Sequence, residues 1–184
     1  MHAHAKVRSR TAAAHSMIDA AFSRFNLCDR HSYVTFLQAH ARVVPTIEAV
    51  LGDETHLPPW RPRTALLARD LDAFGYRLPK PVAQSETWSL AAKFGLLYVL
   101  EGSRLGNQIL LRRAGAGFSS HYLGAAHEPG EWRAFSNALN GRAEQENATW
   151  LEAVVAGANN GFRLYASSAS GFFAASRPAN VSHM

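Results

Sequence analysis

The chain has 184 residues, of which 47% are hydrophobic, and this length and composition suit one domain with a full core. Lys and Arg exceed Asp and Glu, and the formal charge of +5 favours an anionic ligand or an acidic partner, although many proteins carry a similar excess without binding either. The basic residues are scattered and no recognition motif accompanies them, which argues against a nucleic-acid-binding protein.

The first half of the chain predicts three helices. Apolar residues recur every three or four positions over 5–25 and predict one stripe on a first helix. Asp29 is the expected N-cap of a second helix, which bends at Pro45 and stops at Gly52. A third helix is expected over 64–74. The first stripe consists of Val7, Thr11, His15, Ile18, Phe22 and Phe25, and the second of Tyr33, Phe36, Leu37, His40, Val43, Val44 and Ile47.

The second half predicts a long fourth helix over 86–113, with Ser85 as its N-cap. After a loop over 115–130, a short helix is expected around 131–139 and a last helix over 142–173. No segment alternates with period two for long enough to be a strand. We therefore predict an all-α fold in a single domain over 1–184, with frayed ends at about 1–5 and 175–184.

His15 is predicted to point in the same direction as the buried stripe of the first helix. An inward imidazole is either a core histidine bonded to a carbonyl or carboxylate, or an axial ligand of haem iron. His40 allows the same two interpretations on the second helix. Cys28 is the only cysteine, which excludes an internal disulfide and cysteine-based metal centres. The absence of E-x-x-H pairs leaves a helical zinc or di-iron site with weak support.

Gly102 and Gly106 interrupt the strongest helical pattern of the chain. Each glycine costs about 1 kcal/mol relative to alanine inside a helix, so the pair needs compensation. The two lie one turn apart on one face, which Ala92, Gly95 and Val99 extend upstream. Such a strip permits either tight packing against another helix or the close approach of a flat ligand to the main chain.

Three segments together carry a resemblance to a known family. They are T-A-A-A-H-S-M-I-D-A (11–20), L-L-Y-V-L-E-G-S-R-L-G-N-Q-I-L (96–110) and H-Y-L-G-A (121–125). In this combination the chain, over roughly 6–165, resembles the haem oxygenases, and most closely the bacterial biliverdin-producing branch that is linked to phytochromes. The resemblance implies a multi-helix bundle with a kinked distal helix over the haem.

The resemblance also implies roles for particular residues. His15 matches the proximal iron ligand, and its second nitrogen would be held by Glu101 or a backbone carbonyl. The distal candidates for catalysis are Gly102, Ser103, Gly106 and Asn107. The candidates for binding haem b are Arg8, Arg10, His15, Tyr98, Gly102, Gly106, Phe162 and Arg163, among which Arg8, Arg10, Tyr98 and Arg163 would contact the propionates.

Two positions depart from the family pattern. Ser103 stands where mammalian-type enzymes carry an aspartate that orders distal water, whereas bacterial relatives often have serine. Asn107 stands where glycine or alanine is usual, and its side chain would either crowd the distal pocket or form a hydrogen bond to a ligand or a water there.

The resemblance implies that haem is both substrate and cofactor, and that the ring is opened to biliverdin with loss of carbon monoxide and iron. Dioxygen would be the second substrate. Electrons would come from an external ferredoxin or reductase, because the chain has no flavin or nicotinamide motif, and a bacteriophytochrome is a candidate acceptor of the product. Lys93, Arg112 and Arg113 would form either a docking face for an acidic donor or an ordinary solvated face.

We expect a cytoplasmic protein without a membrane partner, because no run approaches about 18 apolar residues and the start has no secretory segment. Two alternatives stay open at this stage. One is a non-catalytic haem-binding or haem-transfer protein on the same scaffold, in which Asn107 disturbs the pocket. The other is an all-α interaction module in which His15 is packed in the core and no haem binds.

Overall fold

The computed structural model describes residues 2–85 and 87–175, and these residues contain helices but no strand. The predicted all-α fold is therefore confirmed. The helices are α1 (Ala3–Arg10), α2 (Ala12–Phe22), α3 (Arg30–Ala41), α4 (Val44–Leu51), α5 (Thr64–Asp72), α6 (Leu90–Leu111), α7 (His121–Gly124), α8 (Glu131–Gln145) and α9 (Ala148–Ala175).

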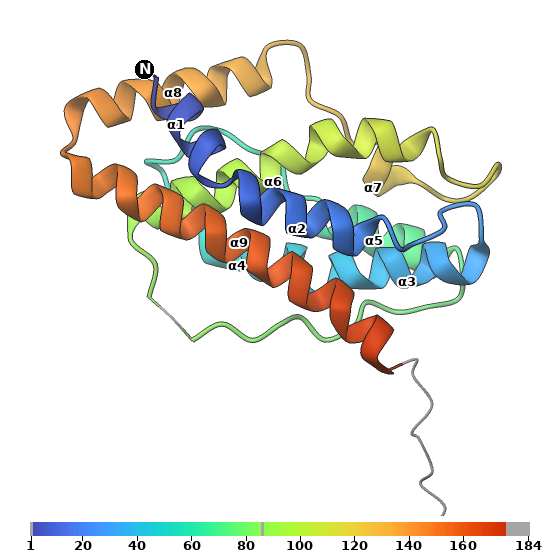
Figure 1. Cartoon of the computed structure of the whole chain (residues 1–184). Helices are drawn as coiled ribbons and strands as arrows, with labels where there is room; N and C mark the ends of the chain where they lie inside the picture. Colours follow the sequence, from blue (N-terminus) through green and yellow to red (C-terminus); the bar gives the residue numbers. More distant parts are fainter. Residues whose placement is uncertain (1, 86, 176–184) are drawn as a thin grey trace, which may run out of the picture.

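The two long helices α6 and α9 form the centre of the molecule; they pack against each other in their N-terminal halves and diverge toward their C-terminal ends (Figure 1). Two glycines make this close approach possible. A Cβ on Gly95 would lie 2.5 Å from the backbone nitrogen of Ala158 and still closer to the carbonyl of Val154, and a Cβ on Gly157 would meet the carbonyl of Ala92. Of the two roles expected for small residues on α6, tight helix packing is therefore the role of Gly95, which faces Gly157 on α9.

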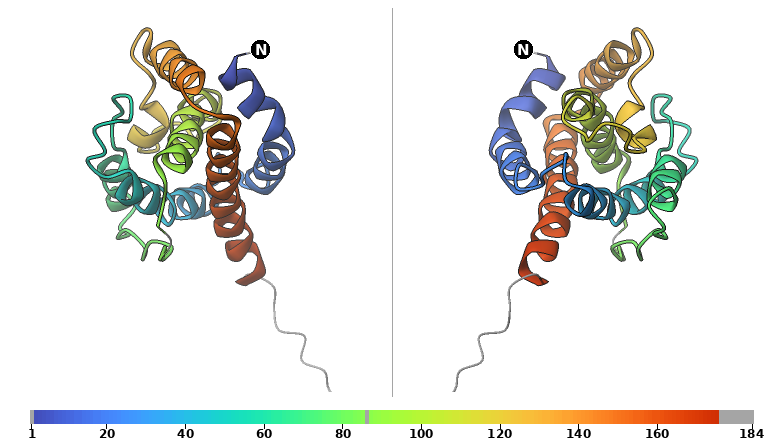
Figure 2. Two further views of the ribbon diagram at one scale, coloured as in Figure 1. Left: turned by 90° about the vertical axis from the view of Figure 1, so that its left-hand side faces the viewer. Right: turned by 90° about the vertical axis from the view of Figure 1, so that its right-hand side faces the viewer.

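Helix α9 also contacts α2, so that α2 and α6 lie on either side of it (Figure 2). Helix α3 contacts α9, α4 contacts α6, and α5 packs on α3 and α4. Helix α8 packs against α1. The buried apolar residues form one cluster that runs from Ala3 in α1 to Ala169 in α9.

The first predicted helix is two helices, because the chain turns at Thr11, whose φ of −107° and ψ of 3° lie outside the helical region. The Thr11 hydroxyl donates to the Val7 carbonyl at 2.8 Å, an arrangement that bends helices. The break allows α1 to pack on α8 while α2 packs on α9. Fraying of residues 3–5 is also wrong, since Ala3 begins α1 and is buried.

The local signals of the second and third helices were predictive. The Asp29 carboxylate accepts a hydrogen bond from the Ser32 amide at 2.8 Å, as an N-cap should. The helix is interrupted before Pro45 and ends at Gly52, whose φ is +52°. Every residue of the predicted second stripe is buried. The third helix ends at Asp72, two residues earlier than predicted.

Three predictions for the second half need correction. Ser89, not Ser85, caps α6, with its hydroxyl accepting from the Ala92 amide at 3.2 Å. Helix α8 continues through Gly141 to Gln145, and α9 begins after Asn147, whose side chain accepts from the Trp150 amide at 3.1 Å. The loop over 115–130 contains the short helix α7. Residues 1, 86 and 176–184, including the expected C-terminal fraying and the predicted start at position 86, lie outside the described residues.

Across the described ranges, no helix combines the length and apolar character that a membrane crossing requires.

Candidate functional site

A cavity of about 890 Å³ lies between α2 and α6, and residues of α9 also line it. This volume is in the range of about 300–1,000 Å³ that is typical of pockets for small ligands and cofactors. His4, Tyr98 and Trp132, which contact one another, line one end. Leu27 and Arg113 line the other, where the chain after α2 meets the end of α6.

His15 lines this cavity from α2, but its direction corrects the sequence prediction. None of the residues of α2 is buried, and the His15 side chain is 60% exposed. The turn at Thr11 explains the difference, because it ends the stripe of α1 and gives α2 a new orientation. His15 is therefore not a packed core histidine but an imidazole at the wall of the cavity.

Asp19 holds the His15 ring from the next turn of the helix. Nδ1 of His15 lies 2.9 Å from Oδ2 of Asp19, and the ring meets Phe162 edge to face with centroids 5.7 Å apart. With Nδ1–H donated to the carboxylate, Nε2 is the nitrogen that can bind a ligand. The expected partner Glu101 is wrong, since its carboxylate is buried beside Arg104.

Gly102 and Gly106 line the cavity from α6, opposite α2. A Cβ on Gly102 would meet only the Trp132 ring, at an ordinary 3.7 Å, and a Cβ on Gly106 would have no neighbour within 4 Å. Neither glycine is needed for helix packing, in contrast to Gly95. Helix α6 continues without a break through both positions. The kink that the resemblance implies would therefore be a bend within one continuous helix. The two glycines leave main chain bare along one wall of the cavity.

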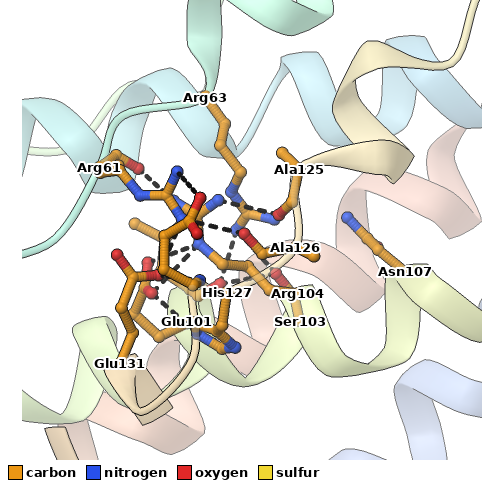
Figure 3. Close-up of polar contacts among 12 residues, drawn as sticks. Arg61, Arg63, Glu101, Ser103, Arg104, Asn107, Ala125, Ala126, His127 and Glu131 are labelled. Atoms are coloured by element: carbon orange, nitrogen blue, oxygen red, sulfur yellow. Dashed lines mark hydrogen bonds and ion pairs between the residues drawn. The ribbon is translucent and has the colours of Figure 1, made fainter. Parts of the chain in front are cut away.

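Ser103 and Asn107 also line the cavity but are tied to neighbouring groups. The Ser103 hydroxyl donates to the Leu100 carbonyl at 2.7 Å and accepts from Arg63 at 2.8 Å (Figure 3). The buried Asn107 amide donates to the Tyr122 carbonyl at 3.5 Å. This bond to the protein anchors Asn107 to α7. Both expectations for its side chain, crowding of the distal pocket and a hydrogen bond to a ligand or water, stay predictions.

The four predicted propionate contacts divide into two pairs. Arg8 and Tyr98 line the same end of the cavity. Burial raises the pKa of Tyr98, so its phenol stays protonated and can donate. Arg10 and Arg163 are not among the lining residues: Arg10 pairs with Glu152 at 2.6 Å, and Arg163 bonds to Asn160 on its own helix. Phe162 does line the cavity, and it contacts His15.

Sequence reasoning missed several residues of the site. His4 lies in the segment that was expected to fray, yet it lines the cavity, and burial lowers its pKa. Trp132 and Tyr165 are lining residues on α8 and α9 that carried no local signal. Arg63 is fully buried, its Nη2 donates to the Leu100 carbonyl at 2.6 Å, and among the described residues its guanidinium forms no ion pair.

His40 lies at the buried side of the cavity, among the rings of Phe22, Phe36, Tyr122 and Tyr165. Its Nδ1 lies 3.0 Å from the Phe36 carbonyl, so that nitrogen carries the proton and Nε2 is a hydrogen-bond acceptor. Burial lowers the pKa of His40 to about 4, opposed by this hydrogen bond and assisted by the charge of Arg63. His40 is therefore neutral near pH 7.

This shifted pKa predicts a loss of stability in mild acid. The unfolded chain binds a proton near the ordinary pKa of 6.5, whereas the folded chain does so only near 4. The contribution of His40 to the free energy of unfolding should thus fall by roughly 3 kcal/mol between these pH values. Urea unfolding of wild type and His40→Phe at about pH 7 and about pH 5 measures it. Equal pH dependence in the two proteins would contradict the assignment.

The predicted basic face on α6 is not one face. Lys93 and Arg112 are 19 positions apart on one helix, about 28 Å along its axis. Lys93 also pairs with Glu54 at 3.3 Å. Arg112 and Arg113 are exposed, and Arg113 lines one end of the cavity. Any basic contact with a partner would involve this end of α6 without Lys93.

The comparisons with known proteins are consistent with this geometry. No family model matches the chain. A curated protein from Xanthomonas campestris pv. campestris (strain 8004), named heme oxygenase, is 30% identical over 138 residues, which are 65% of this chain and 79% of that protein. The crystal structure of the NO- and CO-bound heme oxygenase from Neisseria meningitidis superimposes with a TM-score of 0.81 at 22% identity, covering 100% of this chain and 99% of that chain.

Proposed function

The chain belongs to the haem oxygenase family and is an enzyme of that family, and from this premise we propose that it converts haem to biliverdin, carbon monoxide and ferrous iron. Dioxygen and electrons from an external donor would be consumed. The observation that carries the proposal is the pairing of two walls. The imidazole of His15, oriented by Asp19, lies on one wall of the cavity, and the bare main chain at Gly102 and Gly106 lies on the other.

The residues of the cavity fit haem in their chemistry as well as in the space they leave. A haem has two flat apolar faces, a metal that binds neutral imidazole, and two carboxylates at one edge. The bare glycine wall suits a flat face, and Nε2 of His15 suits the iron. Arg8 and Tyr98 at one end of the cavity suit the carboxylates, since a cation and a phenol both donate to them.

Bound haem supplies the activation of dioxygen and the ring carbon that is oxidised. His15 would bind the iron through Nε2. Asp19 accepts the hydrogen bond from Nδ1–H and thereby fixes the tautomer and orientation of the ring and raises its basicity. Arg8 and Tyr98 would hold the propionates and thereby limit the rotation of the ring in its plane.

The polar groups behind the glycine wall would manage protons. Ser103 is held by Arg63, so its hydroxyl is fixed beside Gly102 at the cavity surface. Neutral His40 presents Nε2 as an acceptor on the buried side. These groups can order water between the protein and the ligand, and water ordered in this way can pass protons on.

Asp19 provides a direct test of the iron side of the site. Asp19→Ala should lower haem affinity or turnover by roughly 10- to 100-fold, the usual cost of losing the hydrogen-bond partner of a metal-binding histidine. Haem titration and turnover under one set of conditions measure the change. The matched control is Asp53→Asn, which removes one exposed loop carboxylate and should behave as wild type. Unchanged affinity and turnover in Asp19→Ala would contradict the role given to Asp19.

The proposed reaction is tested by supplying a reductant in air to the purified protein loaded with haem. We expect steady loss of the Soret band, growth of a bilin absorption and release of carbon monoxide. An unchanged haem spectrum would contradict the proposed reaction and favour a haem carrier on the same scaffold.

A further inference from the structure

A buried ion pair lies on the side of α6 that does not line the cavity. The side chains of Glu101 and Arg104 are 8% and 1% exposed, and Nε of Arg104 lies 3.0 and 3.1 Å from the two carboxylate oxygens of Glu101 (Figure 3). His127 approaches from the loop before α8, with Nε2 3.0 Å from the same carboxylate. The Glu101 carboxylate is thus bonded to donors from two segments, with Nε–H of Arg104 shared between its two oxygens.

Arg104 connects α6 to two further segments through its remaining nitrogens. One terminal nitrogen donates to the Ala125 carbonyl at 3.0 Å, and the other donates to the Arg61 carbonyl. Arg61 in turn reaches the Ala126 carbonyl at 2.9 Å and Glu131 at 2.8 Å. One guanidinium therefore holds together α6, the loop before α5 and the loop before α8.

The turn of α6 that carries this pair is also the turn that carries Gly102 and Ser103. On the cavity side the helix has few protein neighbours here. A Cβ added to Gly102 would meet only the Trp132 ring, and a Cβ added to Gly106 would meet nothing within 4 Å outside its own helix among the described residues. Two glycines also weaken the helix here. The position of the bare main chain therefore depends on the contacts on the other side of α6, among them those of Glu101 and Arg104.

His127 extends the same anchoring to the cavity surface. Its ring lies 5.8 Å from that of Trp132, the residue that packs over Gly102. Its Nδ1 is buried and has no hydrogen-bond partner among the described residues, while Nε2 is the nitrogen that faces Glu101. His127 of the loop before α8 thus reaches the turn of α6 at Gly102 in two ways. It bonds to Glu101, and its ring contacts Trp132, which packs over Gly102.

We propose that Glu101, Arg104 and His127 form a positioning cluster that fixes the main chain at 102–106 over the haem and so determines which meso carbon is oxidised. The inference rests on the proposed function. None of the three residues lines the cavity. They act through the backbone of α6, and a displacement there of even about 1 Å can cost up to roughly 100-fold in rate.

The test uses the double variant Glu101→Gln/Arg104→Met, because removing Arg104 alone would leave a buried, unpaired carboxylate. The double variant should bind haem one to one, with the axial imidazole spectrum of wild type. Its apoprotein should exchange the amide hydrogens of 102–107 faster than wild type, with α9 unchanged. Its product should change from one biliverdin isomer to a mixture. Wild-type exchange at 102–107 together with a wild-type isomer ratio would overturn the proposal.

Milder variants keep the proposal testable if the double variant does not fold. His127→Gln retains a donor for Glu101 and should match wild type, whereas His127→Leu should show the faster exchange at 102–107. Glu131→Gln, which removes only the exposed part of the network, is the matched control and should match wild type. Equal exchange in His127→Leu and His127→Gln would overturn the proposal. If no protein in the series, wild type included, forms a bilin, the proposed function fails, and exchange at 102–107 still decides on positioning.

Discussion

Replacing His15 with alanine is expected to abolish haem turnover. The loss should exceed the roughly 10- to 100-fold effect of losing a ligand's hydrogen-bond partner, because the iron ligand itself is removed. The spectrum of bound haem should lose its imidazole signature. Because the His15 side chain is 60% exposed in an open cavity, added imidazole should reach the iron and restore part of the turnover. Haem titration and turnover with and without imidazole measure both effects.

His31 provides the matched control for this substitution. It is an exposed histidine on α3 that does not line the cavity, and His31→Ala should bind and degrade haem as wild type does. Two other histidines, His4 and His40, do line the cavity. A His15→Ala protein that keeps the imidazole spectrum and full turnover would show that one of these is the ligand instead.

Gly106→Ala is expected to stabilise the apoprotein while impairing haem binding. Apart from its chain neighbours and the backbone of its own helix, the added methyl meets no atom of the described residues within 4 Å, and alanine is favoured over glycine inside a helix by about 1 kcal/mol. In a chain of this length that corresponds to a rise of roughly 2–4 °C in Tm. The same methyl would project into the cavity, where a haem face should lie, so haem affinity should fall. Thermal unfolding of the apoprotein and haem titration give the two opposite signs.

Gly95→Ala separates the two kinds of glycine on α6. Its Cβ would lie 2.5 Å from the Ala158 nitrogen, in backbone that cannot give way cheaply, so the apoprotein should be strongly destabilised. A Gly106→Ala protein that lost stability, or that bound haem as tightly as wild type, would contradict the account of the bare wall.

The helices were predictable where the signal was local. Asp29 caps α3 with its own side chain, and Gly52 ends α4 because glycine readily adopts a positive φ. Both effects depend on the residue type alone and can be read from the sequence. Ser85 and Ser89 are equivalent as caps in the sequence, so the choice between them depends on where α6 meets α9. The turn at Thr11 depends likewise on the packing of α1 and α2 against different helices. Tertiary contacts decided both cases.

The site was predictable where residues violated a local rule. Gly102 and Gly106 were conspicuous because they weaken a helix, and they do line the cavity. The family resemblance singled out His15, which does line the cavity, but its direction was not predictable, since that depends on the turn at Thr11. Arg63 gave no signal, because its contacts on α6 lie about 40 positions away.

The back of the site was the least predictable part. Glu101 was expected as a partner of His15, whereas a Glu and an Arg three positions apart on a helix, such as Glu101 and Arg104, usually form a solvated pair. Their burial depends on carbonyls at 61 and 125 and on His127, and only the folded chain brings these groups together.

The most direct test of the account is a crystal structure of the ferric haem complex. The account predicts the ring between α2 and α6, with iron bound to Nε2 of His15 and the backbone at Gly102 and Gly106 over the opposite face. The propionates should lie near Arg8 and Tyr98. Iron bound by His4 or His40, or haem outside this cavity, would contradict it.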